Sequence, residues 1–198
     1  MGNGRLEAFS DGVFAIIITI MVLEIKVPHG DSVEDLLPLL PVFLSYALSF
    51  VYIGIYWNNH HHMLHVCTTV TGAMLWANLH LLFWLSLLPF ATGWMGENYF
   101  SALPVVLYGV VLLMAAIAYY LLEQTIIRAQ GPDSILKQAV GRDWKGKLSL
   151  VLCIAAIVAS LRLPWIAEAT FVALALIWLI PDRRIENVLR AAGPNHRF

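Results

Sequence analysis

The chain has 198 residues, of which 60% are hydrophobic and 13% are charged, and its mean hydropathy is +0.74. Soluble domains carry roughly 25% charged residues, so this composition excludes a water-soluble protein and predicts a polytopic membrane protein. Because 12 Lys and Arg are balanced by 13 Asp and Glu, the chain lacks the basic field that nucleic acid requires, and we expect no nucleic-acid partner.

Apolar stretches between charged or Gly/Pro-rich breaks predict an all-α protein with six transmembrane helices in one domain over residues 1–198. They are Ser10–Val27, Leu40–Trp57, Ala73–Thr92, Ala102–Leu122, Leu148–Leu161 and Trp165–Ile180. The last two are short, and the Pro in Arg162-Leu163-Pro164 predicts a tight turn between them. A five-span arrangement is the alternative. The two cysteines, Cys67 and Cys153, indicate neither a disulfide framework nor a metal motif.

The basic residues are unevenly divided between the two sides of the predicted bundle. Ten of the twelve Lys and Arg fall in the N-terminal segment, the 123–147 connection and the tail. They are Arg5, Arg128, Lys137, Arg142, Lys145, Lys147, Arg183, Arg184, Arg190 and Arg197. The positive-inside rule then places both termini in the cytoplasm. The opposite side carries Asp31, Glu34, Asp35 and Glu97, which either concentrate cations at an external mouth or are solvated loop residues.

The first predicted helix is too short to span the membrane on its apolar residues alone. The uncharged stretch Gly12–Leu23 covers about 18 Å of a hydrocarbon core that is about 30 Å thick. The span must therefore include Ser10, Asp11 or Glu24. Polar groups at such depth usually face a bundle interior or a water-filled cavity, so we expect this helix to avoid lipid. The alternative is that the helix tilts, or that the two carboxylates lie at the two interfaces.

Helical spacing places one set of apolar residues of this helix on a single face. Ile16, Ile20 and Leu23 follow one another at i, i+4 and i+7, and Thr19 lies beside the first two. Such a stripe either packs against a neighbouring helix or lines a conduction path. Spacing alone leaves both possibilities open.

A short motif precedes the apolar stretch. Residues 5–11 have the pattern R-x-x-x-F-S-D, which runs directly into the helix. Its fixed positions are Arg5, Phe9, Ser10 and Asp11. The motif resembles the signature of the transmembrane protein 175 family of potassium channels. Weaker family-like features are Trp57 followed by His60, and Asn78 with Pro89.

The resemblance implies a potassium-selective cation channel of the single-unit, prokaryotic type, in the inner membrane, in which the first helices of a homotetramer line a central pore. It implies no enzyme activity and no cofactor, with potassium ions as the permeant species and the lipid bilayer as surroundings. Ile16 occupies the position of the hydrophobic constriction, Thr19 and Ile20 lie in the next turn, and Leu23 lies further out. The sequence has no TVGYG-like filter, so discrimination must arise at the bottleneck.

The polar residues of the motif need partners outside it. Arg5 and Asp11 are six residues apart and do not form an i, i+4 pair. We expect Asp11 to accept a hydrogen bond from a polar group at the cytoplasmic ends of the second and third spans, which would clamp the pore helix. The candidates are Trp57, Asn58, Asn59, His60, His61, His62 and Asn78. Ser10 is alternatively the N-cap of the first helix.

Rival functions rest on ionisable groups within the spans. A secondary transporter or proton pathway would use Asp11, Glu24, Glu168 or the histidines, although no inverted repeat is visible. His61 and His65 have the i, i+4 spacing of helical metal ligands, but no nearby Asp, Glu or Cys completes a site. We therefore expect that these histidines bind no metal. They either make the protein respond to pH or form hydrogen bonds at the membrane interface.

Overall fold

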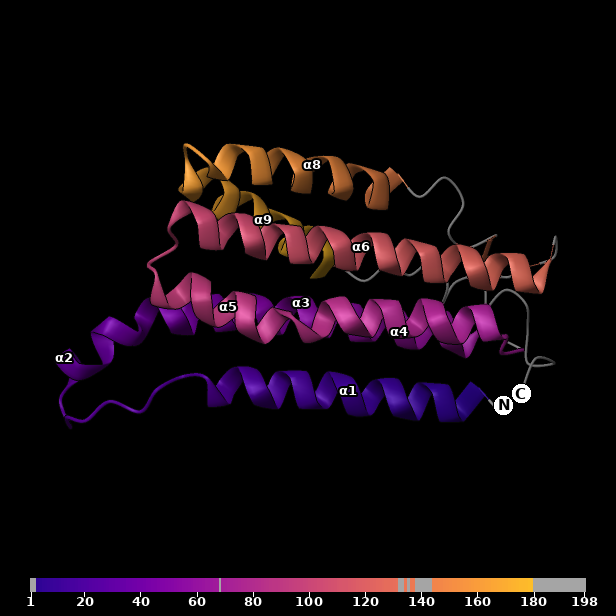
Figure 1. Ribbon diagram of the computed structural model, residues 1–198, viewed down its shortest axis with the longest axis horizontal. Helices are drawn as coiled ribbons and strands as arrows, with labels where there is room; N and C mark the ends of the chain where they lie inside the picture. The colour runs from indigo at the N-terminus through magenta and orange to yellow at the C-terminus, as the bar shows by residue number, and fades with distance from the viewer. Residues whose placement is uncertain (1–2, 68, 132–133, 135, 138–143, 180–198) are drawn as a thin grey trace.

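The computed structural model describes residues 3–67, 69–131, 134, 136–137 and 144–179. Over this part of the chain every regular element is a helix, which confirms the all-α prediction. The elements are α1 (Asn3–Leu23), α2 (Val33–Leu36), the 3-10 turn η1 (Leu37–Leu39), α3 (Leu40–His65), α4 (Gly72–Ser86), α5 (Leu88–Glu97), α6 (Ala102–Gln130), α8 (Trp144–Ser160) and α9 (Pro164–Leu179). The long helices run side by side along the bundle, with α4 and α5 in line with each other (Figure 1).

Four segments of the described chain are long and apolar enough to cross a membrane. They are Asn3–Leu23, Val33–His65, Gly72–Glu97 and Ala102–Gln130. The last two helices, α8 and α9, have 17 and 16 residues and so span about 25 Å each. They are separate helices, joined by a turn in which the Leu163 amide donates to Ala159 O over 2.8 Å. The predicted helical hairpin is confirmed, and the end of its predicted second span at Ile180 lies outside the described residues.

The predicted first and second spans are displaced from the observed helices. Helix α1 begins at Asn3 and ends at Leu23, so the motif is helical and residues 24–27 are not. Helix α3 continues past Trp57 to His65. The late predicted start of the first span and the early predicted end of the second have one cause. The polar residues at these two helix ends contact one another across α1 and α3, so polarity there marks an interhelical contact instead of a loop.

The predicted third span is divided into two helices. Leu87 separates α4 from α5, and Pro89 lies in the first turn of α5. Proline has no backbone N–H and its ring clashes with the carbonyl four residues earlier, here that of Leu85. That carbonyl instead accepts from the amide of Leu87. The proline therefore interrupts the helix without stopping the span.

The helices pack around α6. Helix α6 contacts α4, α5, α8 and α9, whereas α1 packs on α3, α4 and α5 at one side of the bundle. Gly109 permits the close approach of the α8–α9 hairpin to α6, because a Cβ at that position would lie 2.7 Å from Ile157 and 2.8 Å from Phe171. The first helix thus lies at one side of the bundle, opposite the α8–α9 hairpin.

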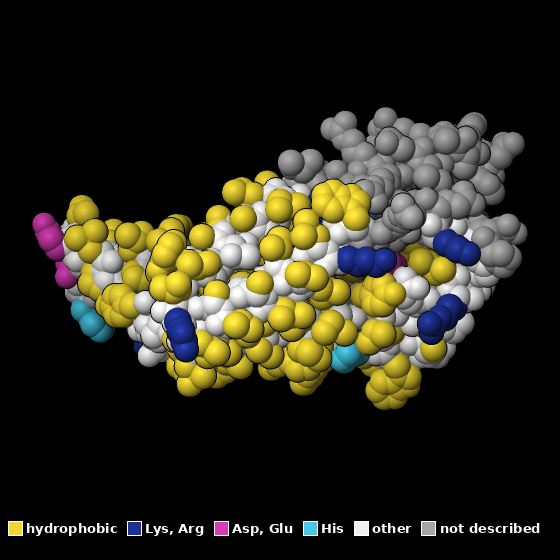
Figure 2. All heavy atoms as spheres, turned by 90° about the horizontal axis from the view of Figure 1, so that it is seen from above, with side chains coloured by type: hydrophobic (Ala, Val, Ile, Leu, Met, Phe, Trp, Pro, Cys, Tyr) yellow, Lys and Arg dark blue, Asp and Glu magenta, His cyan; other side chains and the backbone are white. Residues whose placement is uncertain are grey.

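The outside of the bundle is largely hydrophobic. Figure 2 shows apolar side chains along its length, acidic side chains at the end that α2 occupies, and most of the visible basic side chains at the other end. At the acidic end Lys26 Nζ lies 2.6 Å from Glu97 Oε1, and this hydrogen bond raises the pKa of Lys26. Five of the basic residues used to orient the chain lie outside the described residues. They are Arg142, Arg183, Arg184, Arg190 and Arg197.

Candidate functional site

Helix α1 has one buried and one exposed face. The buried residues recur every three or four positions and are Leu6, Ser10, Phe14, Ile17 and Met21. The predicted stripe lies on the other face, where Ile16, Ile20 and Leu23 are 59%, 42% and 76% exposed. Since a face with large apolar residues requires cover, it must meet lipid or another chain. The single chain therefore presents the predicted pore residues outward from its own bundle.

Thr19 lies on the same exposed face. Its Oγ1 donates to the carbonyl of Ala15 at 2.8 Å, a bond that threonine commonly makes in helices. The donor of the hydroxyl is thereby used, whereas its oxygen keeps lone pairs that can act as acceptors. An oxygen so placed can accept a cation or a water molecule.

A groove borders one flank of this stripe. It lies between α1 and α5, has a volume of about 500 Å³, and is lined by Ile16 and Ile20 on one side and by Phe90 and Trp94 on the other. Glu24, just beyond the end of α1, lines it as well. Glu97, at the end of α5, is a second carboxylate in its lining. The groove is thus apolar along most of its length and carries two carboxylates towards the α2 end of the bundle.

On the buried face, Ser10 connects α1 to two other helices. Its Oγ donates to Leu6 O at 2.9 Å and accepts from Asn78 Nδ2 at 3.0 Å. Asn78 Oδ1 in turn lies 2.7 Å from His60 Nε2. All three polar side chains are fully buried. The hypothesis that Ser10 is an N-cap is wrong, because α1 begins at Asn3 and Ser10 lies within it.

Two contacts at the flank of α1 join it to α3. Trp57 Nε1 donates to Asp11 Oδ1 at 2.9 Å, which confirms the predicted hydrogen bond between Asp11 and the polar group of the second and third spans. One turn away, His61 Nδ1 lies 2.8 Å from Glu7 Oε1. Glu7 was not among the residues predicted to join the two helices. The signal was available, because Glu7 and Asp11 are four apart, as are Trp57 and His61.

The other two motif residues are on the opposite side. Arg5 and Phe9 are exposed, and follow the line of Ile16 on the outward face of α1. Within the described residues Arg5 makes no hydrogen bond or ion pair, so the expectation that it pairs with the polar groups of α3 and α4 is wrong there. The motif is therefore divided between anchoring residues and outward residues.

The histidines at the end of α3 stack on one another. The ring centroids of His61 and His65 are 6.0 Å apart, and His61 also lies against His62. Across the part of the chain that the structure describes, no three His, Cys, Asp or Glu side chains come together as metal ligands would. The alternative of a metal site at His60–His65 lacks a ligand set among these residues.

Known proteins match this chain over a segment that includes the motif. The family model described as "Endosomal/lysosomal potassium channel TMEM175" matches residues 5–89. The chain is 55% identical to a protein of Chryseobacterium sp. (strain P1-3) named as a potassium channel, over 96% of this chain and 99% of that protein. A chicken (Gallus gallus) protein named endosomal/lysosomal proton channel TMEM175 is 38% identical over 46% of this chain and 21% of its own length.

The fold agrees with these sequence matches. A crystal structure described as a lysosomal potassium-selective channel TMEM175 homolog from Chamaesiphon minutus superimposes with a TM-score of 0.77 and 30% sequence identity. The match covers 91% of this chain and 97% of that one. The similarity thus extends well beyond the motif, over nearly the whole chain. The chain belongs to the TMEM175 family.

Proposed function

We propose that this chain is a potassium channel of a prokaryotic inner membrane, and that four copies arrange α1 around a central pore. A relative that matches over 99% of its own length is named a potassium channel, and a matching crystal structure is described as potassium-selective. The observation that carries the proposal is the division of α1 into a buried anchoring face and an exposed face with Ile16, Thr19, Ile20 and Leu23.

The exposed face of α1 favours contact with other protein chains over contact with lipid. It is not uniformly apolar, because Arg5, Gly12 and Thr19 interrupt it. Small residues let helix backbones approach closely within a membrane, and polar residues there face other helices or water. Closed rotational symmetry brings the same face of every copy to one axis, so a tetramer would remove all four exposed faces from lipid at once.

In such a pore the physics of the constriction would follow from Ile16. Four Ile16 side chains around an axis would form a ring from which water withdraws when it is narrow, which closes the pore without a moving plug. A small dilation or rotation of α1 would wet it. Potassium loses its hydration water more cheaply than sodium, so a partly dehydrating ring favours potassium. The Thr19 oxygen would replace some of that water one turn away.

The anchoring contacts would set how α1 moves. Ser10 attaches it to Asn78 on α4, and Asp11 attaches it to Trp57 on α3. These contacts lie on the turns that precede Ile16, at the basic end of the bundle. The constriction would therefore lie just beyond the part of α1 that these contacts fix. Gating would occur by bending or rotation of α1 beyond Asp11, or by joint movement of α1 with α3 and α4.

The orientation of the proposed channel follows from charge. Both termini would be cytoplasmic, with α2 on the outside, where Asp31, Glu34 and Asp35 precede or belong to α2 and Glu97 ends α5. Carboxylates around an outer mouth raise the local concentration of cations. Glu24 in the α1–α5 groove would continue this negative potential towards the constriction.

Proton permeation is a second candidate function, favoured by the naming of the chicken relative as a proton channel. Asp11, Glu24, Glu168 and the histidines would then act as relays. Of these, Asp11 is already bonded to Trp57, and Glu168 lies on α9, which is not among the helices that α1 packs on. A continuous relay would need water within the pore between Asp11 and Glu24.

Recording from purified protein in planar bilayers tests the proposal. Under a potassium gradient at equal pH on both sides, we expect single-channel steps that reverse near the potassium equilibrium potential. A reversal potential that follows an imposed pH gradient would instead support the proton pathway. Electrically silent, saturable uptake would support a carrier and contradict both. The mass of the assembly in detergent checks the tetramer, because a monomer leaves α1 without companions.

A further inference from the structure

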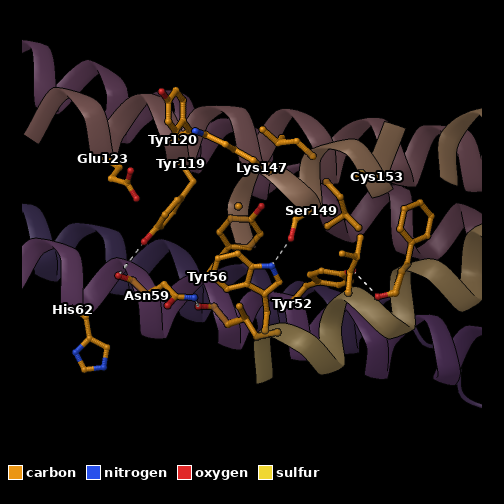
Figure 3. A pocket seen from close by; sticks show the side chains of 18 of the residues that line it. Tyr52, Tyr56, Asn59, His62, Tyr119, Tyr120, Glu123, Lys147, Ser149 and Cys153 are labelled. Carbon is orange, nitrogen blue, oxygen red and sulfur yellow. Dashed lines mark hydrogen bonds between the residues drawn. The ribbon is translucent and has the colours of Figure 1, made fainter. Parts of the chain in front are cut away.

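A second cavity lies on the side of the bundle away from α1. It has a volume of about 380 Å³ and lies between α3, α6, α8 and α9, with the side chains of all four helices around it (Figure 3). None of its lining residues belongs to α1. A volume above about 300 Å³ is in the range of small-molecule sites. The cavity is therefore separate from the proposed pore and large enough for a ligand.

Several polar groups in the walls of this cavity are bonded within the protein. Tyr52 Oη donates to the carbonyl of Phe171 at 2.7 Å, and Trp178 Nε1 donates to Ser149 Oγ at 2.8 Å. Tyr119 Oη lies 3.4 Å from the carbonyl of Asn59. With these groups bonded, the rings present mainly carbon to the cavity. The interior therefore suits an apolar chain better than a polar molecule.

Charged groups lie at one end of the cavity. Glu123 is only 6% exposed and accepts from Gln124 Nε2 at 3.2 Å, so its charge is engaged within the protein. Lys147, at the start of α8, is exposed and extends towards Tyr120 at the rim (Figure 3). An incoming ligand thus meets an accessible positive charge beside an apolar interior.

The charged end of the cavity lies at the level where lipid headgroups are expected. Tyr120, ten residues before the end of α6, and Trp144, at the start of α8, are 45% and 60% exposed, and exposed Trp and Tyr favour the membrane interface. The α8–α9 hairpin is shorter than α6. A chain that enters beside Lys147 would therefore run from the headgroup level into the bundle, between the hairpin and α3.

We propose that this cavity binds the acyl chain of an anionic amphiphile, with its carboxylate or phosphate against Lys147. A free fatty acid and an anionic phospholipid share this chemistry. The occupied cavity would wedge the α8–α9 hairpin against α3 and α6. The proposal does not depend on ion conduction, and its tests measure binding.

Photochemical capture tests the proposal directly. Protein in phosphatidylcholine nanodiscs is irradiated with a diazirine analogue of palmitate, digested and mapped by mass spectrometry. We expect labelled peptides from α3, α6, α8 and α9 around the cavity. Ala116→Phe places a ring in the cavity and should reduce capture about tenfold, the scale of excluding a well-buried apolar chain. Ala173→Phe, on an exposed position of α9, is the matched control and should leave capture unchanged.

Competition on the unaltered protein identifies the headgroup and its source. Dodecanoate should compete best, dodecanol less, and dodecyltrimethylammonium least, and Lys147→Gln should weaken dodecanoate about fivefold while leaving dodecanol unchanged. If membrane lipid is the occupant, replacing part of the phosphatidylcholine by phosphatidylglycerol reduces capture. If a fatty acid is the occupant, only dodecanoate does. Capture that maps elsewhere, or that dodecyltrimethylammonium blocks as well as dodecanoate, overturns the proposal.

Discussion

Trp57 joins α3 to α1 by donating its indole N–H to Asp11 Oδ1 over 2.9 Å. One turn away on both helices, His61 Nδ1 lies 2.8 Å from Glu7 Oε1. The two helices run antiparallel (Figure 1), so a pair of residues four apart on one faces a pair four apart on the other. Helix α1 is thus held at its flank by two polar contacts, and the face that bears Ile16 is left uncovered by this attachment.

Removing the indole donor should loosen this attachment. Trp57→Phe keeps a ring against His61, whose ring centroid lies 6.3 Å from that of Trp57, but leaves Asp11 without the bond. Because the pair is partly exposed, we expect a loss of about 1 kcal/mol in stability and a lower yield of assembled protein. Thermal unfolding and size-exclusion chromatography in detergent measure both.

A double-mutant cycle with Asp11→Ala separates the bond from other effects of each substitution. The double variant should be less destabilised than the sum of the single variants. Trp76→Phe is the matched control, since Trp76 is 75% exposed on α4 and should change neither measurement. Additive effects of Trp57→Phe and Asp11→Ala, with normal conductance, would refute the clamp.

The buried contact from Ser10 through Asn78 to His60 should contribute more to stability than the contact of Trp57 at the flank of α1. Asn78→Leu approximates the volume of the side chain but removes a donor to Ser10 and an acceptor for His60, both of which are fully buried. Each group left unpaired costs about 1–3 kcal/mol, so we expect unfolding at a clearly lower temperature than for Trp57→Phe. Asn98→Leu, on an exposed residue after α5, is the control. Equal melting temperatures for Asn78→Leu and Asn98→Leu would argue against this network.

Ile16 should control both the current and its selectivity. Ile16→Asn puts a polar side chain where the proposed ring is narrowest, which keeps it wet and lets ions pass with more of their hydration water. We expect a larger current and a weaker preference for potassium over sodium, measured from reversal potentials under bi-ionic conditions. Ile154→Asn is the matched control, because Ile154 is 51% exposed on α8. Unchanged selectivity in Ile16→Asn would remove Ile16 from the constriction.

The pattern of apolar residues predicted the order of the spans but misplaced several limits. The first two spans are displaced, the third is divided at Leu87, and α6 continues past the predicted Leu122 to Gln130. Hydropathy places a helix end where polar residues begin, which is why Ser10–Val27 and Leu40–Trp57 were displaced from α1 and α3. The polar residues there are paired between helices, and such pairs are a property of the folded chain. Of these pairs only a bond to Asp11 was anticipated, with Trp57 as one of seven candidate donors, because Asp11 is an ionisable group at depth and required a partner.

The two faces of α1 were predicted less directly. Periodicity gives a stripe through Ile16 and Ile20 but gives equal support to a packed and to an exposed stripe. The structure shows it exposed within the single chain. The role of the stripe came from the resemblance to a known family, since no local property of Ile16 distinguishes a pore residue from one that packs on a neighbour.

The contact between Glu7 and His61 should help to hold α1 against α3. His61 Nδ1 lies 2.8 Å from Glu7 Oε1, and the His61 ring lies against those of Trp57 and His65. Losing the Glu7 carboxylate removes one of the two polar contacts at the flank of α1. Because the contact is partly exposed, we expect a loss of about 0.5–1 kcal/mol in stability and, since α1 is held less firmly, a higher open probability.

Glu7→Ala tests this expectation because it removes the carboxylate and leaves the bond from Trp57 to Asp11 in place. In single-channel recordings at one fixed pH, the variant should open more often than the unaltered channel. His29→Ala is the control, since His29 lies in the loop after α1, at the opposite end of the helix. If Glu7→Ala and the unaltered channel show equal open probability and equal stability, the pair does not hold α1.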